Sequence, residues 1–518
     1  MMSADSIEFV PILRRLSMHP ALRDMGVVGL SSFLAAIAAM LVISIVGKAF
    51  GPILLGEYLL IRRMAAWLQA GVQLPSGVAL PRYVAANLDG PNSTKIAYFV
   101  AALMTACAIG FLLCFVLLLW PIQISGLFFG SPELVHLVLP LCILLMGLAV
   151  HGVVFGYLQG VLQMARASVL QICNLAVLPV LTVVLLRPRH SIPLIVDTIG
   201  LLMILFSCLF ALPILWGGEF SLSAERLKKQ GSELLSYGFS RVSGDFGLQA
   251  LLSLPAVIAA HYFPMSSVAY LLLAGSFLAV VSAATLPLGI ILLSRVSRSI
   301  AQMGTKQLQT PVSYFISALI ELSVFICLQM ILFADVVIRS WVGPTFLQGL
   351  RVIQIAILAV PFYFVYAGLR GVVDAASVKA YNTRNIYLAG VAFLVCVVPV
   401  RIFVPNRWLL GGLAGAGVAG MVVLAGCTLW TVTQLFSINM DWPQLIPGIG
   451  VGVLLGVLSF WIHNMLQYQP GAIALLAYEI ALSAIYLLVL VLINPPWLRF
   501  FRSNMLTHSS PSKGEAND

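Results

Sequence analysis

Apolar runs of about 20 residues recur along this chain from Gly26 to Ile493, and only short polar connections separate them. A helix rises about 1.5 Å per residue, so about 20 residues cross the roughly 30 Å hydrocarbon core of a bilayer. Only 9% of the 518 residues are charged, whereas a typical soluble domain is about 25% charged. The pattern therefore predicts an all-α polytopic membrane protein with almost no soluble part.

Hydropathy predicts about 14 transmembrane helices. We expect the first to be retained rather than cleaved, because many spans follow it and no small-residue cleavage site is evident. The expected spans are 26–47, 53–80, 96–119, 134–158, 168–187, 194–215, 236–260, 266–293, 311–333, 350–372, 386–403, 408–436, 445–463 and 471–493.

The distribution of basic residues predicts the orientation of these spans, because cytoplasmic loops are enriched in Lys and Arg. If the N-terminus is inside, 19 of the 28 basic residues fall in cytoplasmic segments. Both termini are therefore expected in the cytoplasm, and the net charge of +10 reflects these loops rather than nucleic-acid binding. The 19 residues are Arg14, Arg15, Arg23, Arg82, Lys95, Arg166, Arg226, Lys228, Lys229, Arg241, Arg295, Arg298, Lys306, Arg370, Lys379, Arg384, Arg499, Arg502 and Lys513.

An internal repeat divides the chain. A shift of 212 residues, without gaps, aligns residues 51–84 with residues 263–296. Six predicted helices separate the copies, so both run in the same direction, as in parallel transporter repeats. The identical pairs are Pro52/Pro264, Tyr58/Tyr270, Leu59/Leu271, Leu60/Leu272, Leu74/Leu286, Pro75/Pro287, Gly77/Gly289, Leu80/Leu292 and Val84/Val296.

The repeat predicts a six-helix N-lobe over residues 26–215 and a six-helix C-lobe over residues 236–436. Two such lobes around a central cavity would give alternating access when one rocks against the other. Two further helices are expected over 437–493, and cytoplasmic terminal segments over 1–25 and 494–518.

The connection over residues 216–235 is expected to be an amphipathic cytoplasmic linker on the membrane surface. Its leucines alternate with basic side chains at helical spacing, and a calmodulin-like partner site is the weaker alternative. The residues concerned are Leu222, Leu227 and Leu234 against Arg226, Lys228 and Lys229.

Arg62 and Arg63 stand inside the second apolar run, where each costs about 2.5–3.5 kcal/mol to insert at a helix centre. Their counterparts in the repeat are Ala274 and Gly275, so the fold does not require arginine there. Helical spacing places Arg62 on a polar face that also carries Tyr58, Gln69, Gln73 and Ser76.

Arg63 lies about 100° away from Arg62 around the helix, in line with Trp67, Ala70 and Leu74. Arg62 is therefore the first candidate to line a substrate cavity. For Arg63 the alternatives are cavity lining, snorkelling to the headgroups and pairing with another helix.

The seventh predicted helix carries a second polar face with Tyr237, Arg241, Asp245 and Gln249 at four-residue intervals. Arg241 and Asp245 can form an i,i+4 ion pair, which is compatible with an additional role in holding an anionic substrate. Glu321, inside the ninth span, is a candidate for carrying a coupling proton or cation. The alternative for Glu321 is a neutral buried carboxylic acid.

No enzyme, cofactor or metal motif is found in the sequence. The eight cysteines all fall inside apolar spans and show no metal-ligand spacing, so they are expected to be small core residues. We therefore predict no catalytic residues, no cofactor and no metal site, and a protein that is not an enzyme.

Three segments resemble polysaccharide flippases of the multidrug/oligosaccharidyl-lipid/polysaccharide exporter superfamily, and the expected helix count and 6+6+2 plan match its O-antigen (Wzx-type) branch and the related lipid II flippases. The three segments are FGPILLGEYLL, GVALPRYVA and ADVVIRSWVGPTF. The resemblance implies transport of an undecaprenyl-diphosphate-linked oligosaccharide across the bacterial inner membrane. It also implies a cationic cavity. We expect a monomer that works with membrane lipids and other polysaccharide assembly proteins. Arg62, Arg63 and Arg241 suit such a cavity, although periodicity, and not a family position, selects them.

Two other functions are weighed against this one. A proton- or sodium-coupled drug or cation antiporter of the same superfamily would favour an acidic cavity, and the nearest acid here is Glu57 at the outer end of its helix. A membrane-embedded polysaccharide polymerase is expected to carry a sizeable external loop, which this chain lacks.

Overall fold

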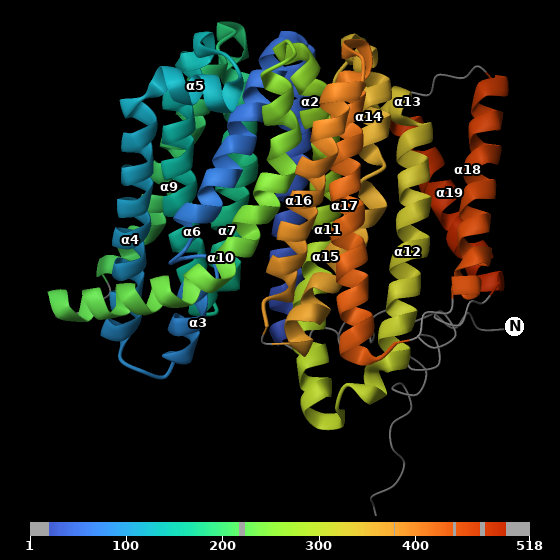
Figure 1. Cartoon of the computed structure of the whole chain (residues 1–518). Coiled ribbons are helices and arrows are strands. Elements are labelled where there is room, and N and C mark those ends of the chain that lie inside the picture. Colours follow the sequence, from blue (N-terminus) through green and yellow to red (C-terminus); the bar gives the residue numbers. More distant parts are fainter. Residues whose placement is uncertain (1–19, 217–222, 378, 439–441, 467–471, 494–518) are drawn as a thin grey trace, which may run out of the picture. The chain divides into compact units, whose positions relative to one another are not determined.

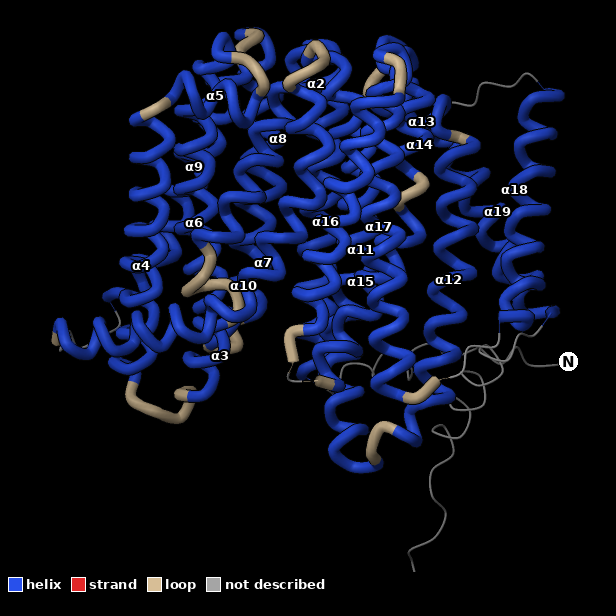
Figure 2. The backbone as a smooth tube through the Cα atoms, in the orientation of Figure 1, coloured by secondary structure: helices blue, strands red, loops and turns tan. Residues whose placement is uncertain are grey.

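The computed structural model describes residues 20–216, 223–377, 379–438, 442–466 and 472–493. Within these ranges every regular element is a helix, as predicted (Figures 1 and 2). The terminal segments predicted over 1–25 and 494–518 lie almost entirely outside the described residues, apart from the start of the first helix.

The described chain divides into two compact units. The first contains the residues up to Val46 and Ile61–Phe246, and the second contains Gly47–Leu60 and the described residues from Gly247 onward. The lobe boundaries predicted from the repeat stay a prediction. The helices at the start of the chain are α2 (Pro20–Val72), α3 (Ala79–Ala86), α4 (Asn92–Leu119), α5 (Pro121–Phe129), η1 (Pro132–Leu137), α6 (Val138–Gly160), α7 (Met164–Ile172), η2 (Cys173–Val177), α8 (Leu178–Leu186), η3 (Arg187–Arg189), α9 (Ile192–Trp216) and α10 (Ala224–Ala260).

The second unit continues with α11 through α19 and carries its own hydrophobic core, in which Ile316, Leu369 and Val432 are fully or almost fully buried. Its helices are α11 (Met265–Met303), η4 (Lys306–Leu308), α12 (Gln309–Leu332), α13 (Ala334–Trp341), η5 (Pro344–Gly349), α14 (Leu350–Ile357), α15 (Val360–Ala376), α16 (Tyr381–Phe403), α17 (Asn406–Phe436), η6 (Trp442–Leu445), α18 (Ile446–Leu466) and α19 (Ala472–Ile493).

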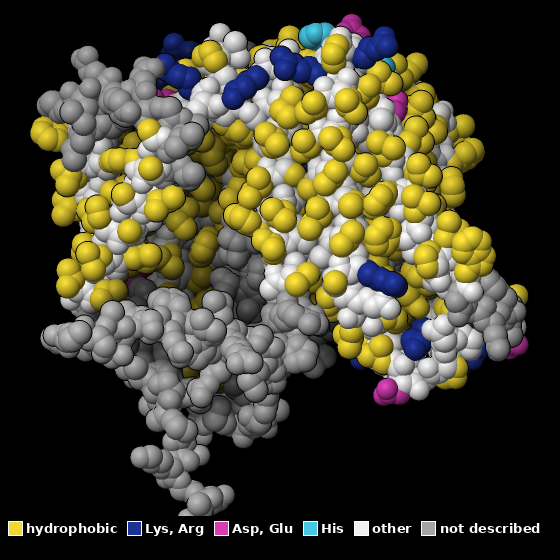
Figure 3. Space-filling model, turned by 180° about the vertical axis from the view of Figure 1, so that it is seen from behind, with side chains coloured by type: hydrophobic (Ala, Val, Ile, Leu, Met, Phe, Trp, Pro, Cys, Tyr) yellow, Lys and Arg dark blue, Asp and Glu magenta, His cyan; other side chains and the backbone are white. Residues whose placement is uncertain are grey.

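The exterior of the described helices is apolar, as a lipid-facing surface requires. Large hydrophobic side chains are exposed along the helices, including Phe111 (63%), Leu185 (72%) and Phe403 (79%). On the face shown in Figure 3, hydrophobic side chains cover most of the described surface, and Lys and Arg gather near its upper and lower margins. A soluble monomer rarely exposes so continuous an apolar surface, so the chain is a multi-pass membrane protein.

Ten helices of the described chain are long and apolar enough to cross a membrane, or eleven if the bent pair Pro344–Ile357 and Val360–Ala376 is one span. One of the ten, Gly26–Val72, has 47 residues. At 1.5 Å per residue it is about 70 Å long, more than twice the hydrocarbon thickness. The count of 14 spans stays a prediction.

Gly51 divides α2 into the two spans expected at 26–47 and 53–80. Its φ of 76° and ψ of −174° are accessible to glycine and break the helix just before Pro52. The second span is shorter than predicted, because α2 ends at Val72 and a turn leads to the short α3.

The predicted linker is helical from Ala224 and continues without interruption into the seventh span as α10. Its first turns run across the lower side of the first unit in Figure 1 before the helix changes direction. The Tyr98 hydroxyl of α4 donates to Glu233 at 2.7 Å, and Leu234 is fully buried. Lys228 and Lys229 are exposed. Leu222 lies outside the described residues, and an amphipathic linker on the membrane surface stays a prediction.

Candidate functional site

The second half of α2, after Gly51, positions the two arginines that the sequence singled out. Arg62 and Arg63 are both partly buried, while Ile61, Met64 and Ala65 beside them are fully buried. Neither arginine lacks an interaction partner within the protein. The pair thus sits in a tightly packed stretch of an apolar helix, where a guanidinium needs other polar groups to offset the loss of water.

The face of α2 that carries Arg62 turns toward α6 at its later positions. Gln69 donates its side-chain Nε2–H to the backbone oxygen of Leu148 at 3.4 Å. The Nε2 atom of Gln73 lies against Gly152, since a Cβ placed there would be only 2.8 Å from it. Both glutamines therefore contact α6 of the same unit, and their contact with a substrate stays a prediction.

The line of residues that includes Arg63 turns toward α5 and α10. The Trp67 ring lies 6.3 Å from that of Phe128 and 5.7 Å from that of Phe246. In the turn after α2, the backbone of Leu74 meets α10 at Gly238, where an added Cβ would lie 1.9 Å from the Leu74 backbone oxygen. Arg63 thus shares its face of α2 with Trp67, which contacts the helix bearing Arg241 and Asp245.

Two side chains of α3, one aromatic and one cationic, pack against the tyrosines of α4 and α10. Tyr83 of α3 stacks on Tyr98 at 5.4 Å and meets Tyr237 edge-on at 6.0 Å. The Arg82 guanidinium lies 4.4 Å from the centre of the Tyr237 ring, a cation–π contact. These contacts hold α3, the start of α4 and the first part of α10 together within the first unit.

The polar face predicted on the seventh helix lies on α10. Its helix is continuous through Arg241, Asp245 and Gln249, which confirms their helical spacing. Asp245 and Gln249 are half-buried, and Asp245 has an interaction partner. The side chain of Arg241 lies outside the described residues, so its predicted pairing with Asp245 stays a prediction. Tyr58 is buried, at 2% exposure.

Glu321 is buried within the second unit, at 1% exposure. Its carboxyl carbon lies 2.4 Å from where a Cβ on Gly448 would be, so it packs directly on α18. Tyr486 of α19 donates its hydroxyl hydrogen to the backbone oxygens of Glu321 and Gly448, at 3.3 Å each. Its ring stacks on Phe325 with centroids 4.0 Å apart. Glu321 therefore lies at the junction of α12 with the last two helices, which the sequence did not indicate.

His151 is favoured by the sequence as a hydrogen-bonded core residue rather than a proton relay, and in the first unit it joins a buried polar network with Asn174 and Ser207, which the sequence did not single out. The Asn174 side-chain amide lies 3.1 Å from His151 Nδ1 and donates to Ser207 Oγ at 2.8 Å. Asn174 lies in η2, a π-helical turn of the kind that often marks functional sites. His151 is thus a hydrogen-bonded core residue. The three residues come from three separate segments, so spacing in the sequence carries no signal for them.

No protein-family model and no curated protein sequence matches the chain. Solved structures do resemble it. The lipid II flippase MurJ in an inward closed conformation matches with a TM-score of 0.67 at 14% identity, over 92% of this chain and 99% of that one. An inward-facing multidrug resistance MATE-family transporter of the MOP superfamily matches with a TM-score of 0.61 at 15% identity, over 78% and 95% of the two chains.

A third structure, the eukaryotic MATE transporter AtDTX14, matches with a TM-score of 0.52 at 14% identity, over 83% of this chain and 99% of that chain. At such low identity the likeness establishes the fold alone. The chain is thus an all-helical, multi-pass membrane protein. More particularly, its fold is the one that these flippases and multidrug transporters of the MOP superfamily share.

Proposed function

We propose that this chain is a transporter of the MOP superfamily, of the polysaccharide-flippase type. It moves an undecaprenyl-diphosphate-linked oligosaccharide across the bacterial cytoplasmic membrane by alternating access, with both termini in the cytoplasm. The observation that carries this proposal is the adjacent pair Arg62 and Arg63, partly buried in an apolar helix. Such charges are costly in a membrane and mark functional sites.

The chemistry of the proposed cargo suits these residues. A guanidinium stays protonated and binds phosphate oxygens bidentately, so Arg62, Arg63 and Arg241 would hold the diphosphate. The neutral polar groups of Tyr58, Gln69, Gln73 and Gln249 would hydrogen-bond sugar hydroxyls. Asp245 would hold Arg241 until the anionic headgroup competes for it, and Glu321 would carry a coupling ion.

A drug or cation antiporter is the second candidate, because the MATE transporters share the fold. Two buried carboxyl groups favour it, since Glu57 is 7% exposed and Glu321 is 1% exposed. The paired arginines weigh against it, because positive charge along the transport path repels a cationic drug.

Reconstitution into liposomes separates the two functions. Wild-type protein is expected to move a fluorescent undecaprenyl-diphosphate oligosaccharide between leaflets, measured by loss of fluorescence to a membrane-impermeant quencher. Arg62→Ala and Arg63→Ala should each slow this movement by roughly tenfold or more, since a charge-assisted hydrogen bond contributes about 1.5–3 kcal/mol. Arg62→Lys keeps the charge and should lose less.

The matched control is Arg189→Ala, which removes one exposed arginine from η3 and should leave the movement unchanged. Normal transport in both arginine variants would remove the pair from the mechanism. Proton- or sodium-driven uptake of a lipophilic cation, without movement of the lipid, would establish the antiporter instead.

A further inference from the structure

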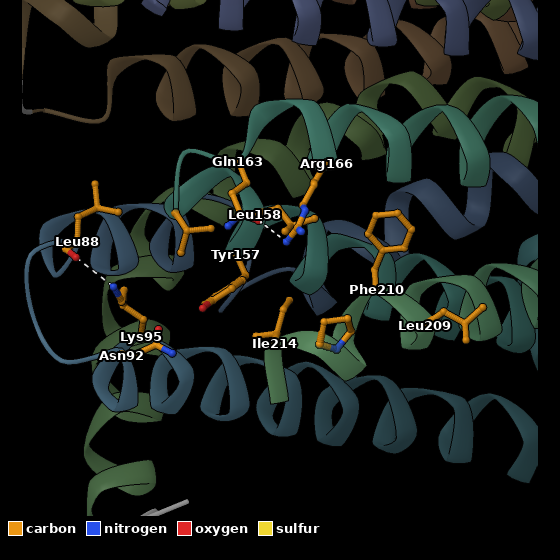
Figure 4. Close-up of a pocket in the computed structure, with 12 residues that line it drawn as sticks. Leu88, Asn92, Lys95, Tyr157, Leu158, Gln163, Arg166, Leu209, Phe210 and Ile214 are labelled. Atoms are coloured by element: carbon orange, nitrogen blue, oxygen red, sulfur yellow. Dashed lines mark hydrogen bonds between the residues drawn. The ribbon is translucent and has the colours of Figure 1, made fainter. Parts of the chain in front are cut away.

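A separate cavity lies within the first unit, between the start of α4, the junction of α6 with α7, and the end of α9 (Figure 4). Its volume is about 550 Å³, within the range of about 300–1,000 Å³ that small-ligand sites occupy. None of the residues proposed above to contact the transported substrate lines it.

One side of this cavity is cationic. Lys95 and Arg166 line it from different helices, and Figure 4 shows Tyr157 between them. The Lys95 ammonium donates to the backbone oxygen of Leu88 at 3.0 Å, and Arg166 Nη1 donates to Gln163 Oε1 at 3.1 Å. These contacts use one donor of the ammonium, which has three, and one of the guanidinium, which has five. Both cations are thus oriented by neighbours and retain donors for an anion.

The charged side chains that line the cavity all have the same sign. Among the described residues that form the cavity wall, two carry positive charge and none carries a carboxylate. The ring of Tyr157 is held by Phe99, with centroids 5.0 Å apart, so its phenol has a fixed position on the cavity wall. Two cations and a hydroxyl around one space match the oxygens of a phosphate group.

The other side of the cavity is apolar and belongs to α9. Leu209, Phe210 and Ile214 form this wall. Leu209 is 51% exposed, and the same helix exposes Leu205 (58%) and ends in Trp216 (82%). Exposed leucines suit contact with acyl chains, and a tryptophan at a helix end is typical of the headgroup level. The cavity therefore joins a cationic corner to an exposed apolar helix surface.

We propose that this cavity is a binding site for the phosphate headgroup of an anionic phospholipid, with the acyl chains along α9. Lys95 and Arg166 both belong to the set that the positive-inside rule assigns to the cytoplasm, the side where anionic lipids attract basic groups. A free phosphate ion shares the headgroup chemistry but makes no use of the apolar wall. The site is independent of the transport proposal, because it lies wholly in the first unit and uses different residues.

Native mass spectrometry of the purified full-length protein tests this site. The probes are phosphatidylglycerol, phosphatidylcholine and inorganic phosphate, each added separately. Wild type should retain phosphatidylglycerol preferentially over phosphatidylcholine and should show no comparable retention of phosphate. The double variant Lys95→Ala/Arg166→Ala should lose roughly tenfold or more in phosphatidylglycerol affinity, because two charge-assisted contacts are removed.

Two further variants guard against misfolding. Arg166 is exposed, so Arg166→Glu should fold normally, and it should weaken phosphatidylglycerol binding by repulsion. Arg189→Ala removes an equal charge at η3 and should bind as wild type does. Unchanged phosphatidylglycerol binding in the double variant and in Arg166→Glu would overturn the proposal. Equal retention of phosphatidylcholine, or retention of free phosphate alone, would overturn it as well.

Discussion

The two copies of the internal repeat share a frame and differ in polarity. The half of α2 after Gly51 and the helix α11 both keep a buried tyrosine, with Tyr58 at 2% and Tyr270 at 7% exposure. Where the first copy carries Arg62, the second carries Ala274, which is 3% exposed. Gln69 corresponds to Val281, which is 2% exposed. The first copy therefore holds charged and amide groups at positions that the second uses for apolar packing.

The comparison of the two copies shows which side chains the helix does not require in order to form. In the second copy Thr285 stands where the first has Gln73, and its hydroxyl donates to the backbone oxygen of Val281 at 2.9 Å within its own helix. Gln73 instead reaches α6 at Gly152. A helix of this repeat can thus be built without arginine or glutamine, so these groups in α2 serve a purpose other than forming the helix.

Ala274→Arg is the most disruptive way to test this comparison. It places an arginine in the second copy at the position equivalent to Arg62, where Ala274 is buried. Overpacking and an uncompensated buried charge should together cost at least ~3 kcal/mol. We expect a strong loss of folded protein, measured as monodisperse material by size-exclusion chromatography and as a lower thermal unfolding midpoint. The reverse change, Arg62→Ala, should leave both nearly unchanged. Equal tolerance of both substitutions would show that the copies do not differ in packing.

Gly238→Ala should have the next largest effect, because it separates α10 from the turn that ends α2. The added Cβ would lie 1.9 Å from the Leu74 backbone oxygen, and a backbone atom cannot turn aside as a side chain does. We expect a loss of about 1–3 kcal/mol, partly offset by the better helix propensity of alanine, about 1 kcal/mol. Gly71→Ala is the control, since an added Cβ there meets nothing within 4 Å. Thermal unfolding should rank Gly238→Ala below wild type and Gly71→Ala level with it or above.

Much of the fold follows from the sequence, because a bilayer forces each crossing to be a long apolar helix. The end of α2 does not follow. Pro75 and Gly77 stand in a turn, whereas their counterparts Pro287 and Gly289 lie inside the continuous α11. The same local residues thus adopt two structures, and the contact of the turn with Gly238 distinguishes the first copy. This contact joins segments that are far apart in the sequence, so a hydropathy profile does not predict it.

The site was predictable only in part for a similar reason. Helical spacing assigns Arg62 and Arg63 to different faces, because the period of a helix is fixed. It could not say that the first face meets α6 at Leu148 while the second meets α10 at Phe246. Packing partners depend on tertiary structure, which a single helix pattern does not contain.

Gln69→Leu should have the smallest effect on folding and gives the sharpest test of what the polar face does. Its bond to the Leu148 oxygen is long, at 3.4 Å, so its loss should cost no more than about 0.5–1 kcal/mol. The variant has nearly the same volume and resembles the second copy, which has Val281 there. If the face binds sugar hydroxyls, transport of the lipid-linked oligosaccharide should fall several-fold while the thermal midpoint barely moves. If transport and stability fall together, Gln69 acts only by packing on α6, and the polarity of this face belongs to the bundle rather than to the cargo.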